Sequence, residues 1–155
     1  MVWLAHNSVA TIVEREGLFL MVEETDVDNT GTQRTVFNQP AGHLEAQETL
    51  FAAAVRETLE ETAWRVELTA LVGVYHYPAP NGVTYIRHCF AASPLGHDPE
   101  RALDGDIIAA HWLSAATILA PDFAARSPIV GRCLRDYLAG HRYPLQLLHH
   151  HGLPA

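Results

Sequence analysis

Three glutamates in the middle of the sequence are spaced so that one metal ion could bind all of them. Glu57, Glu60 and Glu61 lie in residues 47–62, a segment without proline or glycine whose alanines, leucines and glutamates predict a helix. At about 100° per residue, Glu60 and Glu61 lie about 60° and about 40° to either side of Glu57. The three carboxylates therefore share one stripe, and oxygen ligands on adjacent turns suit Mg²⁺, with Mn²⁺ as the alternative ion.

The same stripe has a second interpretation, as the solvated face of a surface helix in an acidic protein. A solvated acidic face normally alternates with lysine or arginine, and here only Arg56 is available. Taken alone, the glutamates leave both interpretations open. Ala53 and Ala54 flank the carboxylates, and their small size would let a ligand approach closely.

Composition limits the substrates and partners that such a site could have. The chain has 155 residues, the length of one domain, and 48% of them are apolar, which is enough for a buried core. All ten basic residues are arginines, so chemistry that depends on lysine is excluded. The formal net charge of -8 disfavours nucleic acid as a partner. Neither a membrane span nor a secretory signal is present, so we expect a cytoplasmic protein without a membrane partner.

Strand-like and helix-like segments are interspersed along the chain. Apolar and β-branched residues predict strands at residues 9–13, 18–22, 64–77, 83–92 and 107–113. Helices are predicted at residues 47–62, from Ser114 to about residue 120, and at residues 128–138. Residues 25–35 predict a polar surface loop, and residues 78–82 predict the turn of a hairpin. This order indicates an α/β protein with a mixed sheet covered by helices.

The acidic segment belongs to a longer motif, GHLEAQETLFAAAVRETLEETAW at residues 42–64, that resembles the Nudix box. The positions in register with the box are Gly42, Glu48, Arg56, Glu57, Glu60 and Glu61. Three departures concern packing rather than metal ligands. Thr58 replaces an aliphatic residue, Ala63 replaces the glycine that ends the helix, and Trp64 is bulkier than the usual aliphatic residue. If residue 63 is left-handed, alanine there costs roughly 1 kcal/mol.

The resemblance implies a single Nudix domain at residues 1–155, an α/β/α sandwich that hydrolyses phosphoric anhydrides. By this resemblance the metal ligands are Glu57, Glu60, Glu61 and the backbone carbonyl of Gly42. Glu57 and Glu60 would then be catalytic, and Arg56 would orient the acidic cluster. For Glu48, two roles stay open: ligation through water or bracing of Arg56.

Residues outside the motif supply further candidates. Asp104 and Asp106 precede the apolar strand at residues 107–113; an ordinary turn is the preferred interpretation of Asp104, whereas Asp106 is hypothesised to be a base or an additional ligand. The candidates for substrate binding are Asn38, Gln39, Arg87 and Tyr75. The alternatives are a surface ion pair for Arg87 and core packing for Tyr75.

The resemblance extends beyond the box, because residues 38–45, 126–128 and 142–145 resemble a bacterial phosphatase branch of the family. This likeness implies small-molecule substrates: nucleoside tri- and diphosphates, hydroxymethylpyrimidine pyrophosphate and thiamine pyrophosphate. It is consistent with a monomer or weak homodimer. One alternative is a nucleotide-sugar or ADP-ribose pyrophosphatase. Another is a Nudix module that senses nucleotides without cleaving them, which is disfavoured because every glutamate of the box is present.

Overall fold

A computed structural model describes residues 1–154. Its elements follow the chain in the order β1 (His6–Arg15), β2 (Leu18–Val27), β3 (Gln33–Asn38), β4 (Ala41–His43), α1 (Leu50–Thr62), β5 (Trp64–Pro78), β6 (Thr84–His97), β7 (Ile107–Ser114), α2 (Ala115–Ile118), α3 (Pro128–Leu138) and a 3₁₀ turn, Leu145–Leu147. The strands form a mixed sheet in the order β3-β2-β1-β6-β5, with β4 added beside β1 and β7 beside β2. Within the described residues, none of the helices is both long and apolar enough to cross a membrane.

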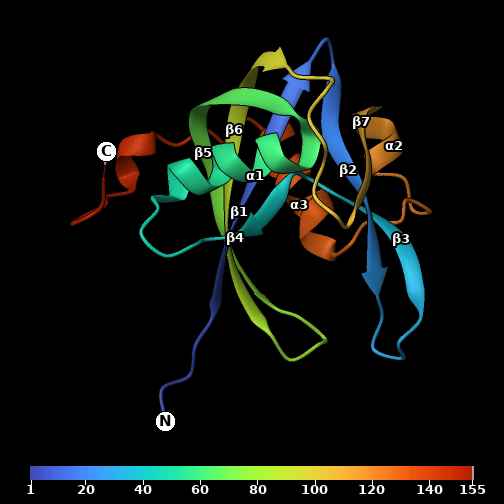
Figure 1. The fold of residues 1–155 in the computed structure, drawn as a ribbon, viewed down its shortest axis with the longest axis horizontal. Helices are drawn as coiled ribbons and strands as arrows, with labels where there is room; N and C mark the ends of the chain where they lie inside the picture. Colours follow the sequence, from blue (N-terminus) through green and yellow to red (C-terminus); the bar gives the residue numbers. More distant parts are fainter. Residues whose placement is uncertain (155) are drawn as a thin grey trace.

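The sheet opens at its centre because β1 and β2 soon separate. These strands pair only next to their connecting turn, at Glu14 with Phe19 and Arg15 with Leu18. Beyond that point β1 pairs with β4 and, in parallel, with β6, whereas β2 pairs with β3 and β7. The sheet is therefore divided into two halves, one containing β1 and the other β2 (Figure 1).

Helices cover both faces of the sheet, as predicted. Alternate residues of β1 face opposite sides: Val9 packs in the cluster that contains Ala53 of α1, and Ala10 packs in the cluster that contains Val130 of α3. In Figure 1, α1 crosses in front of the strands and α3 lies behind them. The prediction that Ala53 and its neighbour Ala54 flank a ligand was wrong, because both are buried in the core under α1.

The boundaries of α1 follow from its two caps. The helix begins at Leu50 rather than at residue 47, because Gln47 has a left-handed φ of 66° and the Thr49 hydroxyl accepts a hydrogen bond from the Ala52 N–H. It ends at Thr62, as predicted. Ala63 follows with φ 60° and ψ 16°, the left-handed conformation in which glycine is favoured, and its N–H donates to the Leu59 carbonyl.

The predicted loop at residues 25–35 is shorter in the structure. Strand β2 continues to Val27 and β3 starts at Gln33, so the two pair as a hairpin. The turn between them is organised by Asp28, whose carboxylate accepts hydrogen bonds from the N–H groups of Thr30 and Thr32. The other predicted hairpin, between β5 and β6, is confirmed.

Candidate active site

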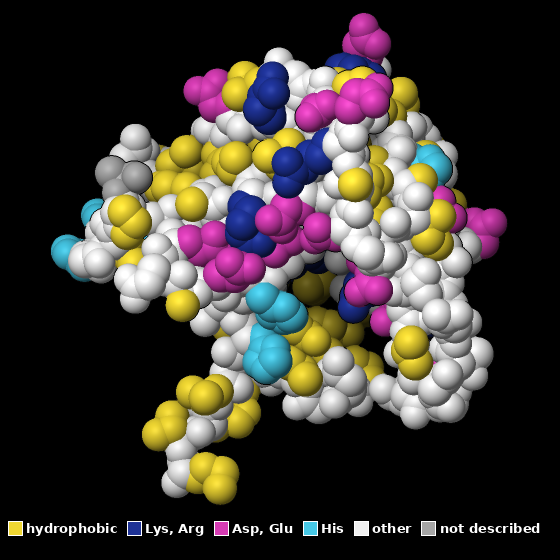
Figure 2. Space-filling view, viewed as in Figure 1, with side chains coloured by type: hydrophobic (Ala, Val, Ile, Leu, Met, Phe, Trp, Pro, Cys, Tyr) yellow, Lys and Arg dark blue, Asp and Glu magenta, His cyan; other side chains and the backbone are white. Residues whose placement is uncertain are grey.

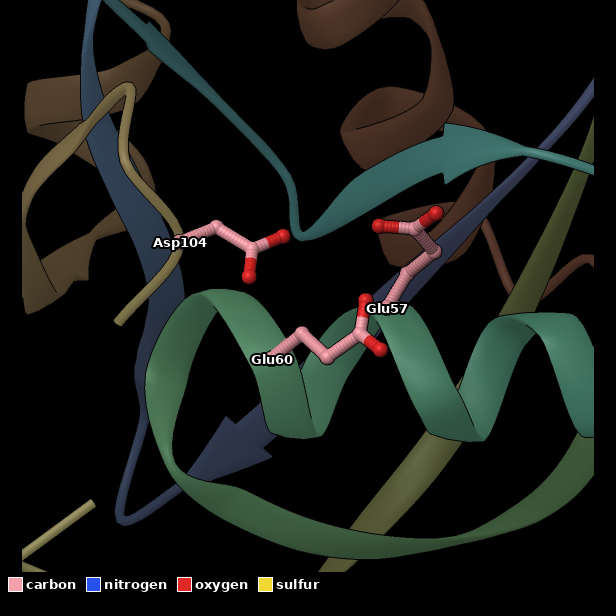
Figure 3. A group of neighbouring side chains, drawn as sticks. All are labelled: Glu57, Glu60 and Asp104. Carbon is pink, nitrogen blue, oxygen red and sulfur yellow. The ribbon is translucent and has the colours of Figure 1, made fainter. Parts of the chain in front are cut away.

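Three carboxylates converge on the exposed side of α1. Glu57 and Glu60 come from the helix, and Asp104 comes from the loop that leads into β7 (Figure 3). One oxygen from each lies within 4.8 Å of the others. The loop is fixed to the helix end, because the Asp104 N–H donates to the Glu60 carbonyl at 3.1 Å. Asp104 therefore lies in a turn, as expected, and its side chain also joins the acidic cluster.

Gly42 makes room for the Glu57 carboxylate. A Cβ at residue 42 would lie 2.1 Å from Glu57 Cδ and 2.2 Å from Oε1, a collision that neither group could avoid without moving. Glu57 thus lies directly against the backbone of β4. The sequence motif placed these two residues 15 positions apart, and the fold brings them into contact.

Arg56 connects the carboxylates of the helix. Its Nη1 donates to Glu57 Oε1 at 2.8 Å and to Glu60 Oε2 at 3.1 Å. On its other side, Nε and Nη2 donate to the two oxygens of Glu48 at 3.0 and 2.7 Å. Two roles had been left open for Glu48, and the structure shows that it braces Arg56. These bonds, foremost those to Glu48, raise the pKa of Arg56 above its ordinary value, and Arg56 in turn lowers the pKa of Glu48.

Glu61 points inward, toward β4, and lies outside the group of three. Its side chain is 5% exposed and accepts a hydrogen bond from the Ala41 N–H at 2.8 Å. Burial raises the pKa of Glu61 to about 8, against the effect of that bond, and the charges of Glu24, Glu57 and Asp104 raise it further. Burial also raises the pKa of Glu57. A bound cation would offset the repulsion between carboxylates that lie this close together.

A cavity of about 850 Å³ adjoins the acidic cluster, between the two halves of the sheet. It shares Ala41, Gly42 and His43 with the smaller hollow that contains Glu57, Glu61 and Asp104. Figure 2 shows acidic, basic and histidine side chains gathered around this opening. A volume of this size suits a small organic ligand.

Three arginines line the cavity, and two of them have carboxylate partners. Arg34 lies 2.8 Å from Asp26, and Arg126 lies 2.8 Å from Glu24. Arg87, on β6, is only 3% exposed, and its Nη2 donates to Asn38 Oδ1 at 2.8 Å. Within residues 1–154, no carboxylate lies within 4.0 Å of the Arg87 guanidinium.

Only two of the four residues expected to bind substrate line the cavity. Asn38 and Arg87 line the cavity. Gln39 is 2% exposed, does not line the cavity, and donates from Nε2 to the Val130 carbonyl at 2.8 Å. Tyr75 also lies outside the cavity, and its hydroxyl donates to Asp136 on α3 at 2.8 Å.

Two tyrosines line the cavity, Tyr77 and Tyr85, and no pattern in the sequence pointed to Tyr85. Tyr77 lies two residues beyond Tyr75 on the same strand face, and Tyr85 is its partner on β6. Residues two apart on a strand share a face, but this period does not tell where along the strand the cavity begins. Asp106 lines the acidic hollow, as its hypothesised role requires, and within the described residues no hydrogen bond or ion pair engages its carboxylate.

Comparisons with known proteins agree with this geometry. The family model described as NUDIX domain matches residues 4–132. Phosphatase NudJ from Escherichia coli (strain K12) is 39% identical over 143 residues, which cover 92% of this chain and 90% of the relative. The structure of a NUDIX hydrolase from Nitrosomonas europaea has a TM-score of 0.89 and 38% identity, covering 96% of this chain and 98% of that one. A MutT protein from Methanosarcina mazei Go1, at 19% identity, a TM-score of 0.71 and coverages of 89% and 96%, shares the fold.

The chain belongs to the NUDIX family. It is a hydrolase of that family, and its mixed sheet between helices is the Nudix fold that the sequence predicted.

Proposed function

We propose that this hydrolase cleaves a diphosphate bond in small organic pyrophosphates, with Mg²⁺ bound and with Mn²⁺ as the alternative ion. The substrates proposed are nucleoside tri- and diphosphates, hydroxymethylpyrimidine pyrophosphate and thiamine pyrophosphate. The observation that carries the proposal is the convergence of Glu57, Glu60 and Asp104 beside a cavity lined by arginines. The likeness to a phosphatase named NudJ supports it. We place this activity in the cytoplasm, in a monomer or weak homodimer.

The residues present fit a hard divalent cation. Carboxylate oxygens from Glu57, Glu60 and Asp104 form a donor set of the type that Mg²⁺ prefers. The Gly42 carbonyl would be a further ligand, because the backbone of Gly42 lies against Glu57. Glu61 stays a proposed ligand, from the buried side of the hollow. When bound, the cation supplies neutralisation of the diphosphate charge and a lowered pKa for a water molecule.

The protein's own groups hold the reactants in place. Arg56 restrains the Glu57 and Glu60 carboxylates, and Glu48 in turn restrains Arg56. In the reaction, a water oxygen bonds to phosphorus, the bond from phosphorus to the bridging oxygen breaks, and that oxygen keeps the electron pair. Asp106, which lines the hollow, is the proposed base that accepts the proton of this water.

The proposal is tested by measuring release of phosphate or pyrophosphate from a panel of substrates with Mg²⁺, and again with a chelator. The panel holds nucleoside di- and triphosphates, hydroxymethylpyrimidine pyrophosphate, thiamine pyrophosphate, a nucleotide sugar and ADP-ribose. We expect metal-dependent turnover of the first four classes. Faster turnover of the nucleotide sugar or ADP-ribose would favour the rival pyrophosphatase, and binding without turnover would favour the sensing module.

A further inference from the structure

The chain that follows α3 passes from one face of the sheet to the other. We call this segment, residues 139–151, the strap. Tyr143 exchanges two backbone hydrogen bonds with Leu71 of the edge strand β5, at 2.8 and 2.9 Å. Beyond this point Leu145 and Leu148 pack in the apolar cluster under α1, on the face opposite α3. In Figure 1 the strap, in red, reaches the start of α1.

At its end the strap supplies a hydrogen-bond acceptor to the first turn of α1. The Leu50 N–H donates to His150 Nε2 at 3.2 Å, and the His150 ring lies edge-on to Phe51, with centroids 5.0 Å apart and planes inclined by 78°. The first N–H groups of a helix have no acceptor within the helix, so this contact supplements the Thr49 cap on Ala52. Nε2 accepts a hydrogen bond only in the neutral imidazole, whose proton is then on Nδ1.

Protonation of His150 would abolish this contact. A protonated imidazole carries an N–H group at both nitrogens, so Nε2 can no longer accept from Leu50. Its positive charge would also lie at the N-terminus of α1, where the helix dipole disfavours a cation. The cap is therefore present while the imidazole is neutral, and it is lost as the pH falls through the range in which histidine titrates.

No nearby carboxylate would offset the charge of a protonated His150. The titratable and charged groups of the surrounding segments are Glu45, Glu48 and Arg56 before and on α1, and His149 and His151 on the strap. Within residues 1–154, no carboxylate lies within 4.0 Å of a ring nitrogen of His150. The Glu48 carboxylate is engaged by Arg56 instead, which lowers the pKa of Glu48, so Glu48 keeps its charge while histidines titrate.

The capped turn lies next to the group that orders the acidic cluster. Glu48 lies two residues before Leu50 and holds Arg56 through two hydrogen bonds, at 2.7 and 3.0 Å. Arg56 in turn donates to Glu57 at 2.8 Å and to Glu60 at 3.1 Å. A displacement of the first turn of α1 therefore moves the Glu48 carboxylate relative to Arg56. Arg56 then restrains the two glutamates less well.

We propose that His150 is a positioning residue for the acidic cluster. In its neutral form it holds the first turn of α1, and through Glu48 and Arg56 it keeps the carboxylates of Glu57 and Glu60 in place. Protonation of His150 releases the turn, so the order of the cluster decreases as the pH falls. The catalytic consequence rests on the proposed function, whereas the cap itself does not.

The test compares wild type with His150→Gln, His150→Ala and His149→Gln. Glutamine offers an amide oxygen that can accept from Leu50 and does not titrate, whereas alanine removes the acceptor. His149→Gln is the matched control, because His149 is exposed and within the described residues its side chain makes no hydrogen bond. Two-dimensional ¹H–¹⁵N NMR spectra with Mg²⁺ present follow the Leu50 amide and the Arg56 Nε–H group from about pH 7.5 to about pH 5.5, where histidine titrates.

We expect the Leu50 amide shift of wild type and His149→Gln to titrate with a histidine, and the Arg56 Nε–H shift to change with it. In His150→Gln neither shift should titrate. In His150→Ala both should lie, at every pH, where those of wild type lie at low pH. A Leu50 shift that does not titrate in wild type, or titrates equally in His150→Gln, would overturn the cap. An Arg56 shift unchanged in His150→Ala would overturn the positioning role.

Turnover at saturating Mg²⁺ gives the catalytic readout. At about pH 7.5, His150→Ala should lower kcat by about fivefold, the factor that corresponds to one lost capping hydrogen bond, and His150→Gln should keep the kcat of wild type. At the low end of the pH range, wild type should fall below His150→Gln by a similar factor. A lower Tm of His150→Ala with unchanged kcat would show a purely structural role and overturn the proposal.

A failure of the proposed function is distinguishable from a failure of this inference. If wild type hydrolyses none of the pyrophosphates, the proposed function fails. The Leu50 and Arg56 shifts then decide whether His150 caps α1 and whether the cap orders Arg56, because both shifts are measured without substrate. If wild type hydrolyses a pyrophosphate and all four proteins have equal kcat at both ends of the pH range, the function stands and the positioning role of His150 is overturned.

Discussion

The acidic hollow and the adjoining cavity differ in their balance of positive and negative charge. In the hollow, carboxylates from α1 and the β7 loop crowd together, and a single guanidinium, that of Arg56, is shared among them. The cavity is lined by both carboxylates and arginines, and Arg34 and Arg126 each have a carboxylate partner. The hollow therefore needs positive charge from outside the chain, whereas the cavity is nearly balanced except at Arg87. We therefore propose that the hollow binds a cation and that the cavity holds the organic part of the substrate.

The largest effect is expected from removing single carboxylates of the acidic cluster formed by Glu57, Glu60 and Asp104. Glu57→Gln and Glu60→Gln should each lower kcat by about a hundredfold or more, because each removes charge at the reacting centre. Glu45→Gln is the matched control, since Glu45 is 68% exposed and lies 3.7 Å from Arg56. Equal losses in all three would mean that the glutamates act as a diffuse field rather than as ligands.

Adding a methyl group at the contact between β4 and α1 should also cause a large loss of kcat. Gly42→Ala places a Cβ on the Glu57 carboxylate and displaces it, and we expect about a hundredfold loss in kcat, the effect of misplacing a reacting group by about 1 Å. Gly96→Ala is the control, because there the new Cβ displaces the end of Arg65, which belongs to neither the acidic cluster nor the hollow. Normal kcat in Gly42→Ala would show that the position of Glu57 is not critical.

Substitution of the two aspartates before β7 should change the dependence of kcat on metal and pH in different ways. Asp104→Asn should lower kcat at least tenfold at limiting Mg²⁺ and recover at high Mg²⁺, as expected of a lost ligand. Asp106→Asn should lower kcat at least tenfold at saturating Mg²⁺ and alter the acidic limb of the pH profile. If Asp106→Asn keeps both the kcat and the acidic limb of wild type, Asp106 is a turn residue and the base lies on the helix.

The smallest expected effect lies outside both regions, at the end of α1. Ala63 has φ 60°, so Ala63→Gly should relieve strain and raise the free energy of unfolding by up to about 1 kcal/mol. The gain is reduced because the Ala63 side chain is buried. Thermal melting measures the difference, and kcat should be unchanged. A lower Tm for the glycine variant would mean that burial of the methyl group outweighs the strain.

Local patterns made much of this fold predictable from the sequence. The end of α1 at Thr62 and the whole of α3 follow from helix propensity and a proline at the first turn, and both were predicted with the correct residues. The extension of β2 to Val27 was missed because a polar edge hairpin lacks the apolar alternation that marks a strand.

Contacts between distant segments were not predictable in the same way. Asp104 reaches Glu60 only because its loop docks on the last turn of α1, a contact that no spacing within the motif encodes. Tyr75 and Tyr77 share one strand face, but the packing of Tyr75 against Asp136 on α3 decides which of them lines the cavity. The motif identified the carboxylates, and tertiary structure decided what surrounds them.

The most direct test of the account is a titration of the metal-free protein with Mn²⁺, followed by the electron paramagnetic resonance signal of the free ion. The wild-type protein should bind Mn²⁺, and Mg²⁺ should displace it. Glu57→Gln and Glu60→Gln should each weaken binding at least tenfold, whereas Glu100→Gln, an exposed position outside the hollow, should bind as wild type does. Equal Mn²⁺ affinity in all four proteins would contradict the assignment of the acidic hollow as a metal site.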